Sequence, residues 1–285
     1  MIKIMFLCDW GESSGDILSR YSNQTPECTG VWKGMKGTPN KNEADVFVVL
    51  EGLEEGVGVD FDRTLFIKRE PNFIKKHDIQ NYKYTLDWAD ANCGITWWLS
   101  KTYDELLAMD YPEKPLLASC VASSKHKHRN QFIQSLYQKK RFSLRRDSVE
   151  IDLYGRGHDQ RLYGERYKGS IEGAGNCKLP GLESYKYTLV MENSQQHNYW
   201  TEKLADAYLA WCIPIYWGCP NVDDYFDKKS FYSISLDDSA CHIKEIINQP
   251  IDHVMIDCLK TARENILNEF NIWEVIWKKI QTEIL

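Results

Sequence analysis

A polar stretch near the middle of the chain separates two apolar segments and carries residues suited to binding an anion. Residues 185–191 have the apolar, β-prone composition of a buried strand, and Glu192 and Asn193 follow them directly. Thr201 then precedes a helical pattern that has Lys203 in its first turn. Backbone N–H groups at a helix start, the positive end of the helix dipole and an ammonium group together suit a diphosphate. We therefore predict a diphosphate site where this helix begins.

The elements that position this site form one strand, loop, helix and strand unit. The helix predicted after Thr201 has apolar residues spaced for one buried face, namely Leu204, Ala207, Tyr208 and Trp211. We expect Pro214 to end this helix, and residues 213–217 to form the next strand before the turn residues Gly218 and Pro220. Such a unit brings the start of its helix to the carboxyl end of its first strand.

The motif residues of this unit resemble those of a known enzyme family. Glu192-Asn193 is followed by Tyr199-Trp200-Thr201-Glu202-Lys203 and then by Pro214-Ile215-Tyr216-Trp217-Gly218-Cys219-Pro220. This order is similar to the signature of glycosyltransferase family 10, the α-1,3-fucosyltransferases, and the chain resembles their soluble microbial members. Several fixed spacings across residues 185–220 make the match far more specific than a lone glycine motif.

Strand-like segments occur on both sides of a linker rich in proline and charge, residues 110–115. Before the linker, the predicted strands are residues 3–8, 44–50, 64–68, 82–86 and 94–99, with a loop at 30–42. After it, we expect a strand at 116–122, a helix at 128–139 and a strand at 149–154. Two such halves predict an α/β fold of two Rossmann-like domains facing a cleft, and the resemblance implies the same GT-B arrangement.

The predicted domain boundaries follow from this pattern and from the family. Residues 1–112 form the domain that would bind the acceptor, and residues 113–269 form the domain that would bind the sugar nucleotide. Residues 270–285 have apolar side chains at helical spacing, so we expect a C-terminal helix with one buried face that packs back on the first domain.

The resemblance implies an inverting transfer of L-fucose from GDP-β-L-fucose to a hydroxyl group of a glycan acceptor, in α-1,3 or α-1,4 linkage. A carboxylate must accept the acceptor's proton, and Glu70, just after a predicted strand, is the candidate base. Arg69 and Pro71 flank Glu70 where the family pattern has other neighbours. Asp87 and Asp90 are the next carboxylates to consider. Lys203 is the candidate for stabilising the leaving diphosphate.

Other residues are candidates for holding the donor because they match family positions. Arg129 follows a basic run at a helix start, where the family has a phosphate-binding arginine. Tyr154 and Gly155 resemble the family's Tyr-Gly-Arg turn, although an ordinary tight turn explains them equally well. The remaining candidates are polar residues of the central motif: Glu192, Asn193, Tyr199 and Glu202. Glu192 has a structural alternative, since its carboxylate is suited to accept backbone N–H groups of the loop.

Asp60-Phe61-Asp62 is a competing motif, because another class of glycosyltransferases holds a divalent metal ion with Asp-x-Asp. The match is short and lies in the domain without the predicted donor site, so we interpret it as a solvated turn and expect no metal or other cofactor. A related transferase that uses another GDP-sugar, or a non-catalytic carbohydrate-binding protein on the same scaffold, is the alternative function.

Composition restricts the class of protein. The chain has 285 residues, of which 43% are hydrophobic and 27% are charged, so it has enough apolar residues for one large or two modest domains. A net charge of −6 argues against a general nucleic-acid binder. Nine scattered cysteines without a Cys-x-x-Cys pair favour reduced thiols. The first ten residues form a predicted strand rather than a signal peptide or membrane anchor, and we therefore expect a cytoplasmic enzyme.

Overall fold

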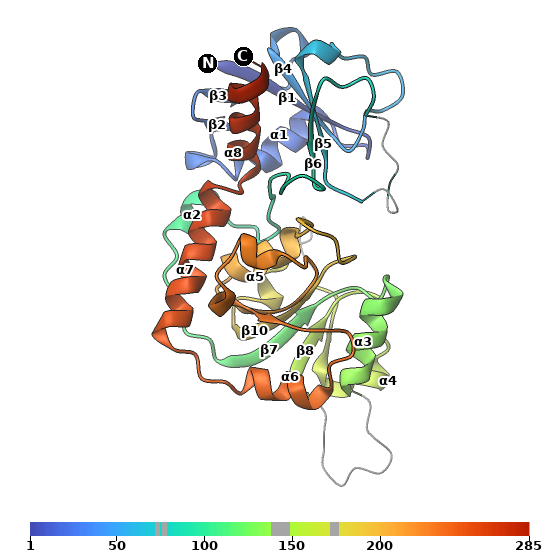
Figure 1. The fold of residues 1–285 in the computed structure, drawn as a ribbon, viewed down its shortest axis with the longest axis vertical. Helices are drawn as coiled ribbons and strands as arrows, with labels where there is room; N and C mark the ends of the chain where they lie inside the picture. The colour runs from blue at the N-terminus through green and yellow to red at the C-terminus, as the bar shows by residue number, and fades with distance from the viewer. Residues whose placement is uncertain (72–74, 76–78, 138–148, 172–176, 285) are drawn as a thin grey trace. The chain divides into compact units, whose positions relative to one another are not determined.

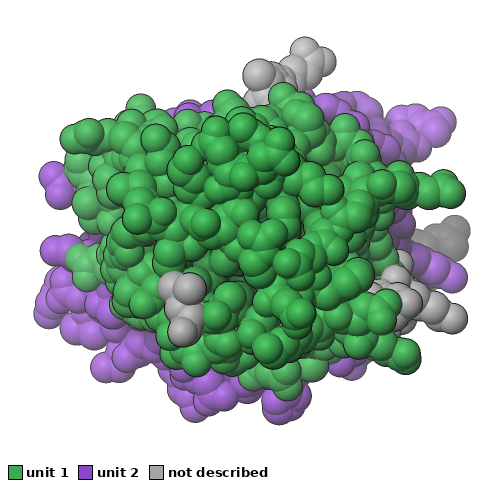
Figure 2. Space-filling model, turned by 90° about the horizontal axis from the view of Figure 1, so that it is seen from above, with its two compact units in different colours: residues 1–96, 101–109, 264–285 green, residues 97–100, 110–263 purple. Residues whose placement is uncertain are grey.

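The computed structural model describes residues 1–71, 75, 79–137, 149–171 and 177–284 (Figure 1). The chain divides into two compact units. Unit 1 comprises Met1–Thr96, Lys101–Met109 and Glu264–Leu285, and unit 2 comprises Trp97–Ser100 and Asp110–Arg263 (Figure 2). The chain thus enters the main part of unit 2 after Met109 and leaves it after Arg263, whereas the predicted boundaries are residues 112–113 and 269–270.

Unit 1 is built on a six-stranded sheet with the order β2-β3-β1-β4-β5-β6. All neighbouring strands are parallel except β2 and β3, which are antiparallel. In sheet order, the strands are Val31–Trp32, Met35–Gly37, Ile2–Cys8, Val46–Leu50, Thr64–Lys68 and Tyr84–Asp87. Strands β4 and β5 are buried throughout, which explains their nearly continuous apolar sequences.

The helices of unit 1 come from both ends of the chain. They are α1 (Ser14–Ser22), α2 (Tyr103–Leu107), α8 (Ile272–Lys279), the π-helical turn η9 (Ile280–Ile284) and the 3-10 turns Pro26–Cys28, Lys41–Glu43 and Phe61–Arg63. Trp273 of α8 is completely buried; its indole N–H donates to the Tyr21 carbonyl at 2.9 Å, and its ring meets Phe6 edge-on at 5.4 Å. These contacts join the C-terminal helix to β1 and α1.

Unit 2 contains a second six-stranded sheet, in which every neighbouring pair is parallel, with the order β12-β11-β10-β7-β8-β9. In chain order, the strands are Leu116–Val121, Ile151–Tyr154, Tyr167–Gly169, Tyr185–Met191, Ile213–Trp217 and Tyr232–Ser233. The chain runs outward from β7 on one side and then resumes at β10 on the other. This is the Rossmann order, and its reversal between β7 and β10 is the place where such sheets bind ligands.

The helices of unit 2 connect these strands. They are α3 (Lys127–Tyr137), α4 (Gln160–Tyr163), α5 (Glu202–Leu209), α6 (Ala240–Ile247) and most of α7 (His253–Asn268), with 3-10 turns at Gly164–Arg166, Leu179–Gly181, Val222–Asp224 and Lys228–Ser230. Residues 138 and 139 of the predicted helix lie outside the described residues. Each unit therefore has the Rossmann-like α/β architecture predicted from the sequence.

Residues 94–99 do not form the predicted strand. Ile95 makes a single bridge to Asn271, and the segment has no other strand pairing. Gly94 has a φ of +86°, and a Cβ atom at this position would lie 2.9 Å from the Ile272 Cα atom. The backbone thus turns close to the start of α8. The apolar composition of the segment reflects burial and not sheet pairing.

Two other local predictions were wrong for reasons of backbone geometry. Helix α5 ends at Leu209, well before Pro214, because Trp211 adopts a left-handed φ of +60°. Pro214 therefore does not end the helix; it lies within β11, whose bounds are those predicted for the next strand, and its register partner on β10 is Thr188. The predicted loop at 30–42 contains the short β2–β3 hairpin, whose turn has positive φ angles at Lys33 and Gly34.

Replacing Trp273 by alanine should destabilise unit 1 strongly. Removing a completely buried tryptophan typically costs about 3–5 kcal/mol of unfolding free energy. The matched control is Trp10→Ala, because Trp10 is 40% exposed and should cost much less. Denaturant titrations of the two variants give the comparison, and equal losses would contradict the packing role of Trp273.

Candidate functional site

A cavity of about 220 Å³ lies within unit 2 at the carboxyl ends of β7 and β8 and the start of α5. Its charged lining residues are Arg129, Arg156, Lys178, Lys203 and Glu202. Among the described residues, four cationic side chains therefore line the cavity, together with a single carboxylate. The position beside the β7–β10 reversal and this charge balance make the cavity suitable for a polyanionic ligand.

Gly155 allows the turn after β8 to approach the turn after β7. Its φ is +136°, and a Cβ atom there would lie only 1.9 Å from the Ala122 carbonyl oxygen. Backbone hydrogen bonds join the two turns, from Ala122 N–H to the Tyr154 carbonyl at 2.9 Å and from Ser124 N–H to the Arg156 carbonyl at 3.0 Å. Only glycine fits this position without moving the backbone, so Gly155 shapes one wall of the cavity.

Arg129 lies in the first turns of α3 and is 4% exposed. One terminal nitrogen, Nη1, donates to the Met191 carbonyl at 3.2 Å and to Asn193 Oδ1 at 3.1 Å. Its buried Nε atom has no hydrogen-bond partner among the described residues. A buried, unpaired donor of a charged group that lines a cavity is costly unless a ligand satisfies it. The guanidinium group is thus oriented by the end of β10 and suited to bind an anion.

Glu192 connects the end of β10 to the start of α5. The carboxylate is completely buried and accepts hydrogen bonds from the Thr201 N–H at 2.8 Å and the Thr201 hydroxyl at 2.7 Å. Burial raises the pKa of Glu192, whereas Lys203 and Thr201 favour the ionised form. Thr201 in turn accepts from the Lys203 N–H as the N-cap of α5. These contacts agree with the structural alternative proposed for Glu192.

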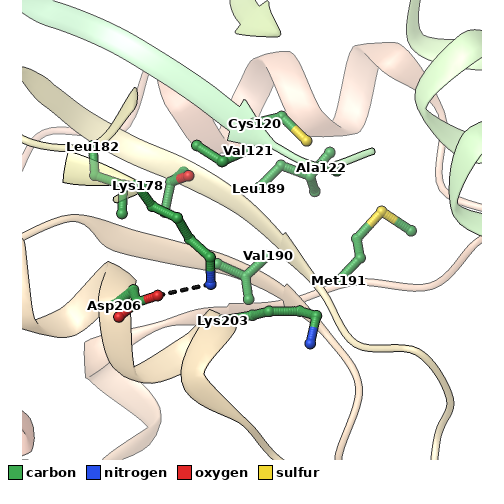
Figure 3. Close-up of a pocket in the computed structure, with 11 residues that line it drawn as sticks. Cys120, Val121, Ala122, Lys178, Leu182, Leu189, Val190, Met191, Lys203 and Asp206 are labelled. Carbon is green, nitrogen blue, oxygen red and sulfur yellow. Dashed lines mark hydrogen bonds and ion pairs between the residues drawn. The ribbon is translucent and has the colours of Figure 1, made fainter. Parts of the chain in front are cut away.

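Charged side chains at the start of α5, together with Lys178, form a row of alternating sign. Lys203 Nζ lies 3.1 Å from Glu202 Oε1, which lies 3.5 Å from Lys178 Nζ, and Lys178 Nζ lies 2.7 Å from Asp206 Oδ2. Figure 3 shows Lys178 reaching toward Asp206, while the ammonium group of Lys203 points away from it. Burial opposes the charge of Lys203, but the carboxylates of Glu202 and Glu192 outweigh burial and raise its pKa. Lys203 is therefore cationic at neutral pH.

The structure places the predicted donor residues in different ways. Arg129, Gly155, Glu202 and Lys203 all line the cavity. The other four belong to unit 2 but do not line the cavity. Asn193 orients Arg129, and Glu192 holds Thr201. The Tyr154 hydroxyl contacts the Tyr185 hydroxyl at 2.9 Å, and Tyr199 is buried.

Sequence reasoning missed two cationic residues of the cavity, Lys178 and Arg156. Lys178 stands outside every motif that the sequence shows, so no local pattern marks it. Arg156 directly follows Gly155, and its place in the Tyr-Gly-Arg turn was a signal that could have included it.

Glu70, the predicted base, lies in unit 1 just after β5. The buried Glu51 carboxylate accepts the Glu70 N–H at 3.1 Å and the Arg69 N–H at 2.5 Å through the same oxygen, Oε1. Glu51 itself has a left-handed φ of +63° at the end of β4. The backbone of Glu70 is thus held by the Glu51 side chain, which directly follows the neighbouring strand β4. Its role as a base stays a prediction.

Asp60 and Asp62 form a turn. Asp60 Oδ1 accepts the Asp62 N–H at 3.1 Å as the cap of a 3-10 turn, and Asp60 Oδ2 pairs with Arg63 Nε at 3.0 Å. Within the described part of the chain, no group of three or more His, Cys, Asp or Glu residues is arranged to hold a metal ion. These contacts agree with interpreting Asp60-Phe61-Asp62 as a capped turn. All nine cysteines carry free thiols.

Comparison with known proteins gives one family match. Residues 112–249 match the family model described as the C-terminal part of glycosyltransferase family 10 (fucosyltransferase). The chain is 43% identical over 67 residues to an α-1,3-fucosyltransferase of Helicobacter pylori and 28% identical over 102 residues to a putative fucosyltransferase-like protein of Arabidopsis thaliana. These alignments span 22% and 36% of this chain but only 14% and 16% of the two relatives. The predicted resemblance to family 10 is thus confirmed.

Solved structures share the fold over nearly the whole chain. A crystal structure of an α1,3-fucosyltransferase with GDP has a TM-score of 0.54 at 18% identity, covering 99% of this chain and 91% of that one. The DNA-modifying enzyme β-glucosyltransferase has a TM-score of 0.53 at 9% identity, with 99% of each chain covered. The GT-B fold class, with two Rossmann-like domains, is therefore confirmed. Among the described helices, none is both long and apolar enough to cross a membrane.

Binding of inorganic pyrophosphate should raise the pKa of His126, which precedes α3. Burial is the largest cause that lowers this pKa to about 4, and the neighbouring cations Arg129, His128, Lys125 and Lys203 lower it further. An anion in the cavity would offset those positive charges and favour the imidazolium form. NMR titration with and without pyrophosphate measures the shift, with the exposed His253 as the control resonance. An unchanged His126 titration at saturating pyrophosphate would place the anion elsewhere.

Proposed function

We propose that the chain is an inverting fucosyltransferase that moves L-fucose from GDP-β-L-fucose to a hydroxyl group of a glycan, in α-1,3 or α-1,4 linkage. The observation that carries the proposal is the cationic cavity at the β7–β10 reversal. The motif residues Glu202 and Lys203 line it together with Arg129, whose Nε has no partner among the described residues. The match to the fucosyltransferase family and a GDP complex among proteins of the same fold support GDP-fucose as the donor.

In this proposal, the cavity binds the diphosphate of the donor. Arg129 supplies an oriented guanidinium group, and Lys203 supplies an ammonium group at the start of α5, the positive end of the helix dipole. As the bond between the anomeric carbon and the diphosphate oxygen breaks, negative charge grows on GDP. Cations fixed in a partly buried site stabilise that charge more in the transition state than in the ground state. The chain's own cations thus serve the leaving group, so the proposed reaction requires no metal ion.

The acceptor reacts in the same step. Its hydroxyl oxygen attacks the anomeric carbon from the face opposite to GDP, so the β-linked donor gives an α-linked product. The proton of that hydroxyl passes to Glu70, whose position is set by the Glu51 contacts. GDP leaves with the electron pair of the broken bond. The acceptor glycan would be recognised by unit 1, consistent with the division expected from the family.

GDP should protect the protein against thermal unfolding, and this measurement tests the donor proposal. A ligand at one hundred times its dissociation constant stabilises the folded state by about 2.7 kcal/mol. Lys203→Ala should lose most of this protection and also turnover, because Lys203 faces both bound and departing diphosphate in the proposal. The matched control is Lys186→Ala, since Lys186 is exposed on β10. No protection of the wild-type protein by GDP would refute the proposed donor.

Fucose transfer itself separates the preferred donor from other GDP-sugars. With GDP-fucose and a panel of glycan acceptors, the expected product is a fucosylated glycan with release of GDP. Transfer from another GDP-sugar at a higher kcat/KM would favour a related transferase. GDP binding without transfer from any GDP-sugar would favour a carbohydrate-binding protein.

Glu70→Gln should lower turnover and leave GDP binding nearly unchanged. Glutamine keeps the shape of the side chain but cannot accept the acceptor's proton, and general-base catalysis typically contributes ~10²–10⁴-fold. Steady-state kinetics measure turnover, and calorimetry measures GDP binding. The control is Glu54→Gln at an exposed position of the same unit. Normal turnover of Glu70→Gln would move the search to Asp87 and Asp90.

A further inference from the structure

Lys178 is a cationic residue of the cavity to which neither the sequence motif nor the proposed function gives a role. Its side chain is 21% exposed, nearly the same as the 22% of Lys203, and both residues line the cavity. Lys178 precedes the 3-10 turn at Leu179–Gly181, between β9 and β10, whereas Lys203 belongs to α5. Two ammonium groups from separate segments of unit 2 therefore reach the same cavity.

The ammonium group of Lys203 has three partners in the structure. Its Nζ lies 3.0 Å from Thr201 Oγ1, 3.1 Å from Glu202 Oε1 and 3.5 Å from Glu192 Oε2. Two of its three N–H donors are used in the hydrogen bonds to Thr201 and Glu202, and the buried Glu192 carboxylate adds an ion pair. Lys203 can therefore give one donor to a phosphate oxygen while it stays paired with carboxylates.

Lys178 also has a donor available. Its Nζ lies 2.7 Å from Asp206 Oδ2 and 3.5 Å from Glu202 Oε1, and these are its partners among the described residues. One donor remains, and the Glu202 contact is much longer than the 2.7–2.9 Å typical of a strong charge-assisted hydrogen bond. A phosphate oxygen can take the third donor, or replace Glu202 at little cost, since Glu202 keeps Lys203 as its partner.

The ammonium group is also held in place. The Lys178 N–H donates to the Trp98 carbonyl at 2.7 Å, and the Trp98 N–H donates to Asp206 Oδ1 at 2.8 Å. One peptide segment thus fixes both partners of the ion pair. Burial opposes the charge of Lys178, but Asp206 and Glu202 outweigh it and raise its pKa, which keeps the group cationic at neutral pH.

We propose that Lys178 binds the diphosphate of the nucleotide donor directly, as a second ammonium ligand beside Lys203. This inference rests on the proposed function, because it concerns the same cavity and the same ligand. The alternative is that Lys178 only neutralises the buried Asp206, which is completely buried and needs a partner. If Lys178 binds the diphosphate, its loss should weaken the binding of ligands that contain phosphate and leave the others unchanged. If it only neutralises Asp206, its loss should affect both kinds of ligand equally.

The test is calorimetric binding of GDP, inorganic pyrophosphate and guanosine to Lys178→Met. Charged hydrogen bonds typically contribute enough for roughly a 10- to 100-fold change in affinity. GDP and pyrophosphate should therefore bind about 10- to 100-fold more weakly than to the wild-type protein, while guanosine binding stays unchanged. Lys178→Arg, which keeps the charge, should restore part of the loss. The matched control is Lys168→Met, because Lys168 pairs with Asp152 outside the cavity lining.

A second variant keeps the inference testable if Lys178→Met does not fold. The double variant Lys178→Met/Asp206→Asn removes both charges of the pair, and the asparagine amide oxygen can still accept the Trp98 N–H. It should fold and show the same selective loss of GDP and pyrophosphate. Wild-type affinity for GDP in either variant, or an equal loss of guanosine binding, would overturn the role of Lys178. Failure of the wild-type protein to bind GDP would instead refute the proposed function.

Discussion

One buried carboxylate fixes the start of helix α5. Glu192 has no exposed surface, and a buried carboxylate is costly unless hydrogen bonds and an opposite charge satisfy it. Thr201 supplies the hydrogen bonds through its N–H and hydroxyl groups, and Lys203 supplies the charge. The end of β10 and the first turn of α5 are therefore held together. The Glu-Asn and Thr-Glu-Lys parts of the motif are the two sides of this contact.

The charged side chains around the cavity hold one another in place. Lys203, Glu202, Lys178 and Asp206 alternate in sign along one side, so each cation is held by a carboxylate. Arg129 differs, because its buried Nε atom has no partner among the described residues. Side chains that are already oriented lose little entropy on binding, and their electrostatic effect needs no reorganisation during a reaction. The carboxylates thus lower the net charge of the site but hold its cations in place.

The sequence predicts the centre of this site well because the motif residues are also those that hold the local fold. Arg129, Gly155 and Lys203 were named from their positions, and all three line the cavity. Lys178 could not be named, because its proximity to the cavity depends on the Trp98 backbone, far away in the chain. Residues 94–99 are a similar case, since their apolar composition reflects packing near the start of α8 and not sheet pairing. Tertiary contacts, and not local composition, decided these positions.

The path of the chain also matters for how the protein can be divided. It passes between the two units after Thr96, after Ser100, after Met109 and after Arg263, so neither unit is one continuous segment. A fragment of residues 110–263 alone would lack Trp98, whose peptide groups hold both Lys178 and Asp206. Such a fragment would contain every residue of the central motif but would lack the hydrogen bonds that position Lys178 and Asp206. Domain exchange between related chains therefore has to transfer residues 97–100 together with the larger segment, and a single junction in the linker is not sufficient.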